Sequence, residues 1–111
     1  MLTKKHSIII IIIFASIILN IQNMSTKLSP HFTLEEMTVT KTGLPNIPNV
    51  EQTNELRKLC CDILEPLRNK AVHAPIIVDS AFRSSAVNKS VGGVKTSQHL
   101  LGQAADIRLR S

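Results

Sequence analysis

The sequence predicts a small α+β domain in which an antiparallel sheet is flanked by helices. The indications are one clear amphipathic helix in the middle of the chain and two short β-rich segments after it. A length of 111 residues allows a single domain. With three Phe and neither Trp nor Tyr, the core must consist mostly of Leu, Ile, Val, Met and Ala.

A capping box marks the first helix. In the segment HFTLEEM, Thr33 is followed three residues later by Glu36. This spacing lets each residue cap the other's backbone, and it predicts a short helix over residues 34–38. Gly43, Pro45 and Pro48 then predict a loop.

The second helix is predicted by apolar residues at steps of three and four along the chain. Asn49 is the expected N-cap residue, with Gln52 at the box position. Pro66 removes one backbone donor, so a kink or an end is expected near Glu65. The apolar stripe comprises Leu56, Leu59, Cys60, Ile63, Leu64 and Leu67.

Two strands and a short helix are predicted after this. IIVDSAF over 76–82 is typical of a mostly buried strand. Ser84 or Ser85 then caps a short helix that ends at Gly92. In QAADIRLR, apolar residues at 105, 107 and 109 alternate with charged ones, which predicts a second strand.

The distribution of charge argues against nucleic-acid binding. The net charge is +5, of which Lys4 and Lys5 contribute two, and the rest contains neither a dense basic run nor interleaved aromatics. We therefore expect no nucleic-acid partner.

Cys60 and Cys61 are adjacent and cannot form an ordinary disulfide, so two buried or half-buried thiols are expected.

Residues 1–23 form a hydrophobic leader with three open interpretations. A charged start and an apolar run over 8–19 resemble a secretory signal, since twelve residues make only ~18 Å of helix. The segment after it lacks a good cleavage site, so an uncleaved anchor with membrane contact is the second interpretation. The third is a misassigned start, with Met24 opening the domain over 24–111. The first two predict an exported or envelope protein, and the third a cytoplasmic or phage-associated one.

His99 and Asp106 form the candidate metal site. An imidazole and a carboxylate held together can bind zinc. His99 precedes the second strand and Asp106 lies on it, while Gly102 allows the backbone to turn between them. Spacing alone leaves a surface ion pair or a loop-bracing hydrogen bond as alternatives.

The segment FRSSAVNKSVGGVKTSQHLLGQAADI resembles the signature of the M15 zinc peptidases, the D-alanyl-D-alanine carboxypeptidase and hedgehog-like group, in their M15A or M15_3 branch. The pattern S-x-H-x-x-G-x-A-x-D is matched in full from Ser97 to Asp106. HFTLEEM and ILEPLR are also similar to this branch. The resemblance covers about residues 28–107 and implies a hedgehog/DD-peptidase-like fold.

The resemblance also implies a role for each matched residue. His99 and Asp106 match two of three zinc ligands, Arg83 matches a catalytic and substrate-facing arginine, and Ser97 matches a serine of the substrate cleft. The structural alternatives are a surface salt bridge for Arg83, for example to Asp79, and loop capping for Ser97. His31 and His73 are expected in non-ligand loop positions.

The family pattern continues beyond this chain, with a strand that carries the third zinc ligand and an acidic general base. We therefore expect a domain that is incomplete at its C-terminus, with an unpaired sheet edge and an uncovered apolar face. The implied function is zinc-dependent hydrolysis of D-Ala-D-Ala-type bonds in peptidoglycan peptides, impaired by the missing groups. The alternatives are a non-catalytic cell-wall-binding or phage structural module, and a remnant that folds poorly.

Overall fold

The structure is a computed structural model that describes residues 25–110. It contains helices and two antiparallel two-stranded sheets, which confirms the predicted α+β class. The predicted leader over 1–23 lies outside the described residues. The elements are, in chain order, β1 (Lys27–Ser29), β2 (Phe32–Thr33), α2 (Leu34–Met37), α3 (Val50–Leu59), η1 (Cys60–Leu64), η2 (Leu67–Val72), β3 (Ile76–Ser80), α4 (Ser85–Ser90), η3 (Gln98–Leu101) and β4 (Asp106–Leu109).

Both predicted capping boxes are present. The Thr33 hydroxyl accepts the Glu36 N–H at the start of α2, and the Glu36 carboxylate accepts the Thr33 N–H. Asn49 and Gln52 make the same reciprocal pair at the start of α3, with both distances at 2.8 Å. These bonds satisfy N–H groups that the first turn of a helix leaves without a partner.

Of the two outcomes predicted near Glu65, a kink or an end, the end does not occur in the long helix formed by α3, η1 and η2. The helix continues through Pro66 to Val72, and the segments on both sides of the proline are π-helical. The Glu65 N–H donates to the Cys60 carbonyl, five residues back. Pro66 still removes one donor from the ladder, and the change of register around it is the local response.

The apolar stripe of this helix is buried at Leu56, Cys60 and Leu64, as predicted. Ile63 is an exception, with 56% of its surface exposed. A π-turn holds more residues than an α-turn, so a three-residue step from Cys60 stops short of the core side. The π-helix thus removes Ile63 from the stripe, which the α-helical spacing could not predict.

The core lies between the long helix, α2 and the inner side of β3. Leu59, Leu67, Ala105 and Ile107 are partly buried against it. The buried members are Leu28, Phe32, Met37, Leu56, Cys60, Leu64, Ile76, Val78, Ala81 and Phe82.

Cys60 and Cys61 are both free, and Cys61 is exposed, so the prediction of two buried or half-buried thiols is wrong for Cys61. Burial raises the pKa of the Cys60 thiol to about 12, with smaller contributions from Cys61 and Glu65.

The strand pair β3–β4 brings the candidate site together. Val78 pairs with Ile107 and Ser80 with Asp106, with a register shift between the two pairs. The strand ends at Ser80 rather than continuing to Phe82, because the chain turns inward and the Phe82 N–H donates to the Met37 carbonyl. This pairing places Asp106 beside the segment that leads to Arg83.

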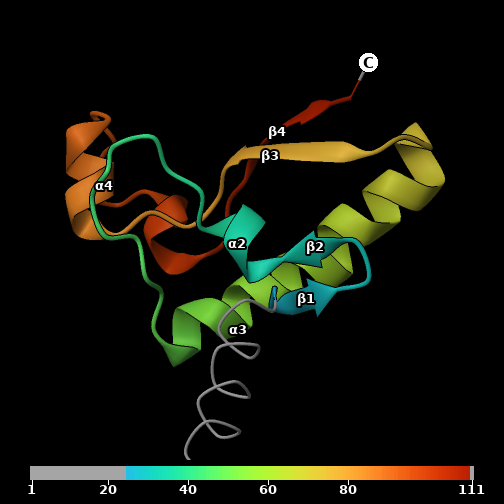
Figure 1. Cartoon of the computed structure of the whole chain (residues 1–111), viewed down its shortest axis with the longest axis horizontal. Coiled ribbons are helices and arrows are strands. Elements are labelled where there is room, and N and C mark those ends of the chain that lie inside the picture. The colour runs from blue at the N-terminus through green and yellow to red at the C-terminus, as the bar shows by residue number, and fades with distance from the viewer. Residues whose placement is uncertain (1–24, 111) are drawn as a thin grey trace, which may run out of the picture.

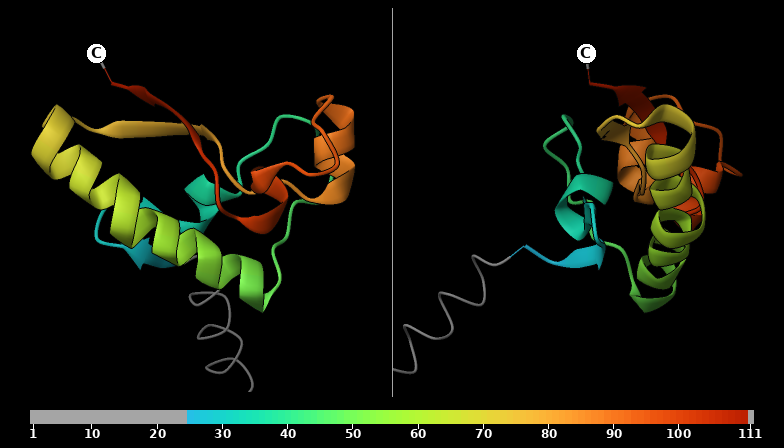
Figure 2. Two further views of the ribbon diagram at one scale, coloured as in Figure 1. Left: turned by 180° about the vertical axis from the view of Figure 1, so that it is seen from behind. Right: turned by 90° about the vertical axis from the view of Figure 1, so that its right-hand side faces the viewer.

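The predicted short helix and both turns are also present. Ser84 caps α4, and Gly92 follows it with a φ of 76°. Gly102 ends η3 with a φ of 74°, and an added Cβ there would lie 2.7 Å from the Gln52 carbonyl oxygen. Only glycine fits this close approach of η3 to α3. Figures 1 and 2 show α4 and η3 at one end of the molecule, far from the turn between η2 and β3.

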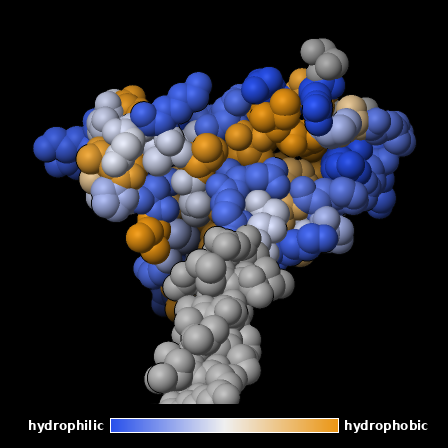
Figure 3. All heavy atoms as spheres, in the orientation of Figure 1, coloured by the Kyte–Doolittle hydropathy of each residue, from blue (hydrophilic) through white to orange (hydrophobic). Residues whose placement is uncertain are grey.

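Within residues 25–110 the second sheet has two strands, so the outer edges of β3 and β4 are unpaired. Apolar residues gather on the surface around β3 (Figure 3). A hollow of about 520 Å³ there is lined by Val39 and Ile76–Val78, among others.

The described helices are each too short or too polar to cross a bilayer.

A buried carboxylate ties the first sheet to the long helix. Glu65 accepts the Ser29 hydroxyl and the His31 N–H, each at 2.7 Å, and lies 2.8 Å from His31 Nδ1. Burial acts to raise the pKa of Glu65, but the hydrogen bonds from His31 and Ser29 outweigh it, and the pKa is lowered. His31 is thus a turn residue, as expected, with a structural partner that its position in the sequence did not reveal.

Replacing Glu65 with Gln should cost about 1–3 kcal/mol at pH 7, because three donors lose a charged acceptor. A lowered folded-state pKa means that ionised Glu65 stabilises the fold above its ordinary pKa of 4.5. This stability is lost as the pH falls from there through the folded-state pKa. Urea unfolding between pH 7 and pH 3 should show a weaker acid dependence for Glu65→Gln. The exposed Glu51→Gln variant is the control, and an equal acid dependence in all three proteins would contradict this account.

Candidate metal centre

The imidazole of His99 is fixed in one orientation by the main chain. Its Nδ1 lies 2.6 Å from the Ala81 carbonyl oxygen. A carbonyl can only accept, so Nδ1 carries the proton and Nε2 of the neutral ring presents a lone pair. The His99 side chain is 13% exposed, and its Nε2 faces Asp106, whose side chain is largely exposed. A second hydrogen bond of this kind is typical of metal-binding histidines.

Asp106 faces this lone pair from the start of β4. Its Oδ2 lies 3.5 Å from His99 Nε2, and its side chain is 59% exposed. Two tetrahedral zinc ligands at normal bond lengths stand about 3.4 Å apart, so the pair fits a shared zinc ion. Two acceptor atoms at this distance repel each other unless a cation or a proton lies between them. The geometry therefore allows two states, a metal chelate or an imidazolium–carboxylate pair.

Arg83 holds both partners of the pair. Its backbone N–H donates to the His99 carbonyl at 3.0 Å, and its Nη2 lies 3.3 Å from Asp106 Oδ2. Its Nε donates to the Ser80 hydroxyl at 3.3 Å. Arg83 thus forms the salt bridge expected as its structural alternative, but with Asp106 rather than with Asp79, which pairs with Arg108 at 3.0 Å. A carboxylate has enough lone pairs to accept Arg83 and a metal at once.

Ser97 lies at the start of η3, where its hydroxyl accepts the His99 N–H at 3.2 Å. Ser97 therefore has the capping role that was expected as its structural alternative. This bond also fixes the backbone of His99 from a second direction. A role for Ser97 in substrate binding stays a prediction.

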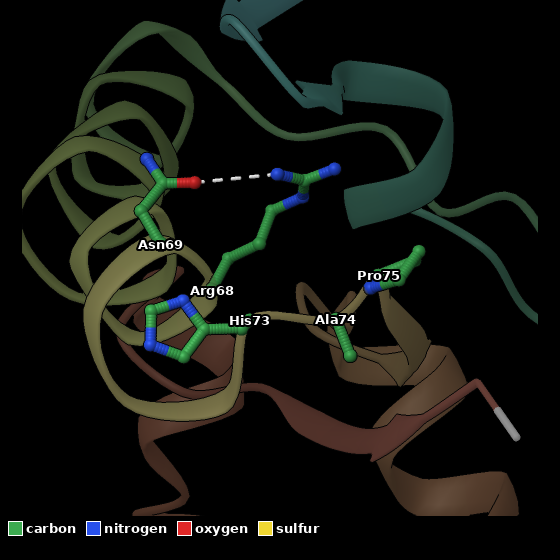
Figure 4. A pocket seen from close by; sticks show the side chains of 5 residues that line it. All are labelled: Arg68, Asn69, His73, Ala74 and Pro75. Atoms are coloured by element: carbon green, nitrogen blue, oxygen red, sulfur yellow. Dashed lines mark hydrogen bonds between the residues drawn. The ribbon is translucent and has the colours of Figure 1, made fainter.

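The other two histidines of the described residues, His31 and His73, lie elsewhere. His31 contacts Glu65, and His73 ends the long helix with a φ of 47°. His73 lines a hollow of about 240 Å³ together with Arg68, Asn69, Ala74 and Pro75. Figure 4 shows these side chains and the hydrogen bond that Arg68 donates to Asn69. This hollow lies at the far end of the long helix from η3 and has no acidic lining residue. Residues 25–110 contain no group of three or more His, Cys, Asp or Glu side chains placed to share a metal ion.

The sequence was compared with models of known protein families. Residues 30–111 match the sequence model of the family described as Peptidase M15. The chain belongs to the M15 peptidase family. No curated protein and no solved structure matches it. The M15 match covers every residue of the His99–Asp106–Arg83 arrangement.

Asn88 is a residue of the candidate site that was not predicted from the sequence. It is 4% exposed on α4. Its Oδ1 lies 3.4 Å from Arg83 Nη1, and its Nδ2 donates to the Val94 carbonyl at 2.9 Å. An added Cβ on Gly93 would lie 2.0 Å from Asn88 Oδ1, so any other residue there would displace the Asn88 side chain. The sequence feature that points to Asn88 is its place inside a predicted helix, where asparagine is unfavourable unless its side chain has a specific partner.

Replacing Asn88 with Ala should release the guanidinium of Arg83 and lower zinc affinity about tenfold, as expected for a group behind the ligands. In zinc-free samples, the NMR signal of the Arg83 Nε–H should be broader or shifted in Asn88→Ala compared with the unaltered protein. Asn54→Ala is the matched control, since Asn54 accepts a hydrogen bond from Arg57 at 3.1 Å on the exposed side of α3. An unchanged Arg83 signal and zinc affinity in Asn88→Ala would show that Asn88 only braces the loop.

Proposed function

We propose that this chain is a zinc-dependent peptidase domain that acts on D-Ala-D-Ala-type bonds of peptidoglycan peptides, with His99 and Asp106 as metal ligands. One observation carries the proposal. The Ala81 carbonyl fixes Nδ1 of His99 as a donor, so that Nε2 faces Asp106 Oδ2 at 3.5 Å. This arrangement is satisfied by a shared cation, and M15 membership favours a metal over a proton.

Zinc, when bound, would polarise a water molecule and the scissile carbonyl. Arg83 supplies fixed donors next to the metal ligands, because Ser80, Asn88 and Asp106 hold its guanidinium in place. Its side chain is still 17% exposed, so it is able to donate to the oxygen on which charge develops. Ser97 accepts one bond with its hydroxyl oxygen and keeps a proton to donate to substrate.

Two protein ligands hold zinc less tightly than the three of a usual catalytic site. The described residues provide His99 and Asp106 but no third ligand beside them. Hydrolysis that is slow, and that requires more zinc than a three-ligand site, is therefore part of the proposal. The same observation supports the second candidate function, a non-catalytic module that binds cell-wall peptides or serves as a phage structural part.

The deciding experiment measures hydrolysis of a synthetic peptide ending in D-Ala-D-Ala, with release of D-Ala followed by chromatography. We expect release that stops after treatment with a chelator and returns when zinc is added. The Arg83→Lys variant should be at least tenfold slower, because a single ammonium cannot reproduce the fork of donors. Binding of peptidoglycan without any hydrolysis at saturating zinc would instead favour the non-catalytic module.

A further inference from the structure

A groove of about 640 Å³ lies between α4 and the loop that follows it, and we call it the α4 groove. Its lining includes two lysines, Lys89 and Lys95, and no acidic residue. Neither ammonium forms an ion pair with a residue of the described part of the chain. The volume is in the range of grooves that bind small ligands and short peptide segments.

The groove adjoins the candidate metal centre. Asn88 lines it, and the same side chain accepts a hydrogen bond from Arg83. Leu100 also lines it and directly follows His99 in η3, which packs against α4. A peptide held with one bond at His99 and Asp106 would therefore have neighbouring groups within reach of the groove.

Charge is unevenly distributed along the chain. Residues 81–111 contain five basic residues and one acidic residue, a net +4. Residues 24–80 contain six basic and seven acidic residues, a net −1. The positive charge thus belongs to the part of the chain that forms the site and the groove, where it would attract anionic ligands.

We propose that the α4 groove binds a side-chain carboxylate of the peptide substrate through Lys89 and Lys95. This inference rests on the proposed function, since it names the class of peptide that the same site would take. No aromatic residue lines the groove, so it offers no surface on which nucleic-acid bases could stack. Two flexible ammonium groups suit a carboxylate, which they hold as point charges.

The test uses zinc-free protein and two peptides that differ in one group. Acetyl-D-Glu-D-Ala-D-Ala carries a side-chain carboxylate, and acetyl-D-Gln-D-Ala-D-Ala carries a carboxamide of the same shape. Calorimetry should show about three- to tenfold tighter binding of the carboxylate peptide, as expected for two exposed ion pairs. The double variant Lys89→Gln/Lys95→Gln should bind both peptides equally. The control Lys58→Gln/Lys70→Gln changes the net charge equally on the long helix and should keep the preference.

Equal binding of both peptides by the unaltered protein would overturn the inference, as would a preference that survives in Lys89→Gln/Lys95→Gln. Binding of a short single-stranded DNA more tightly than the carboxylate peptide, lost in the same variant, would also overturn it in favour of a nucleic-acid site. The measurement needs neither zinc nor hydrolysis. Failure of the proposed function therefore shows in the hydrolysis assay, and failure of the groove shows here.

Discussion

Replacing His99 with Ala, or Asp106 with Ala, should lower the zinc affinity of the protein about a hundredfold or more. Removal of a group behind a ligand already costs about 10–100-fold, and each of these changes removes a ligand itself. The loss should be of similar size in both variants, because one remaining donor cannot chelate the ion. Competition with a fluorescent zinc chelator at pH 7 gives the affinities.

Two control variants separate this effect from a general loss of charge or imidazole. Asp79→Ala removes a carboxylate from β3 that pairs with Arg108 at 3.0 Å. His73→Asn removes an exposed imidazole and keeps a residue that tolerates a positive φ. Both controls should bind zinc as the unaltered protein does. Unchanged affinity in His99→Ala and Asp106→Ala would remove the site assignment.

Replacing Phe82 with Ala should destabilise the domain by about 3–5 kcal/mol, the usual cost of deleting a large aromatic side chain from a core. Phe82 is fully enclosed, and its N–H donates to the Met37 carbonyl. A small domain has a total stability of about 5–15 kcal/mol, so the loss should leave a measurable unfolded fraction at 25 °C. Urea unfolding followed by circular dichroism measures it.

The effect should extend to the candidate metal centre, because Phe82 directly precedes Arg83 and its carbonyl accepts a hydrogen bond from Asn46. Ile47→Ala is the control, since that side chain is 82% exposed and its removal should change stability by less than about 0.5 kcal/mol. A loss under 1 kcal/mol in Phe82→Ala would mean that the core does not form around this residue.

Local signals in the sequence predicted much of the fold correctly. The capping pairs at Thr33–Glu36 and Asn49–Gln52 depend on contacts three residues apart, and both form as expected. Gly92 and Gly102 occupy the positive-φ positions that end α4 and η3. Such features are encoded by neighbouring residues, so a single sequence reveals them.

Features that depend on packing could not be predicted in this way. The helix continues past Pro66 because π-type bonding surrounds the proline, and this also moves Ile63 out of the core. At the candidate site, the resemblance identified His99, Asp106 and Arg83. It did not show that the Ala81 carbonyl and Asn88 hold them, because these contacts join segments that only the fold brings together.

The central claim is that His99 Nε2 and the Asp106 carboxylate bind one divalent cation. Crystals grown with zinc, measured at the zinc absorption edge, test this most directly through the anomalous difference map. The account predicts a peak about 2.0–2.2 Å from both atoms, with Nδ1 of His99 still bonded to the Ala81 carbonyl. Zinc found only at other positions, with His99 and Asp106 joined as a metal-free pair, would contradict it.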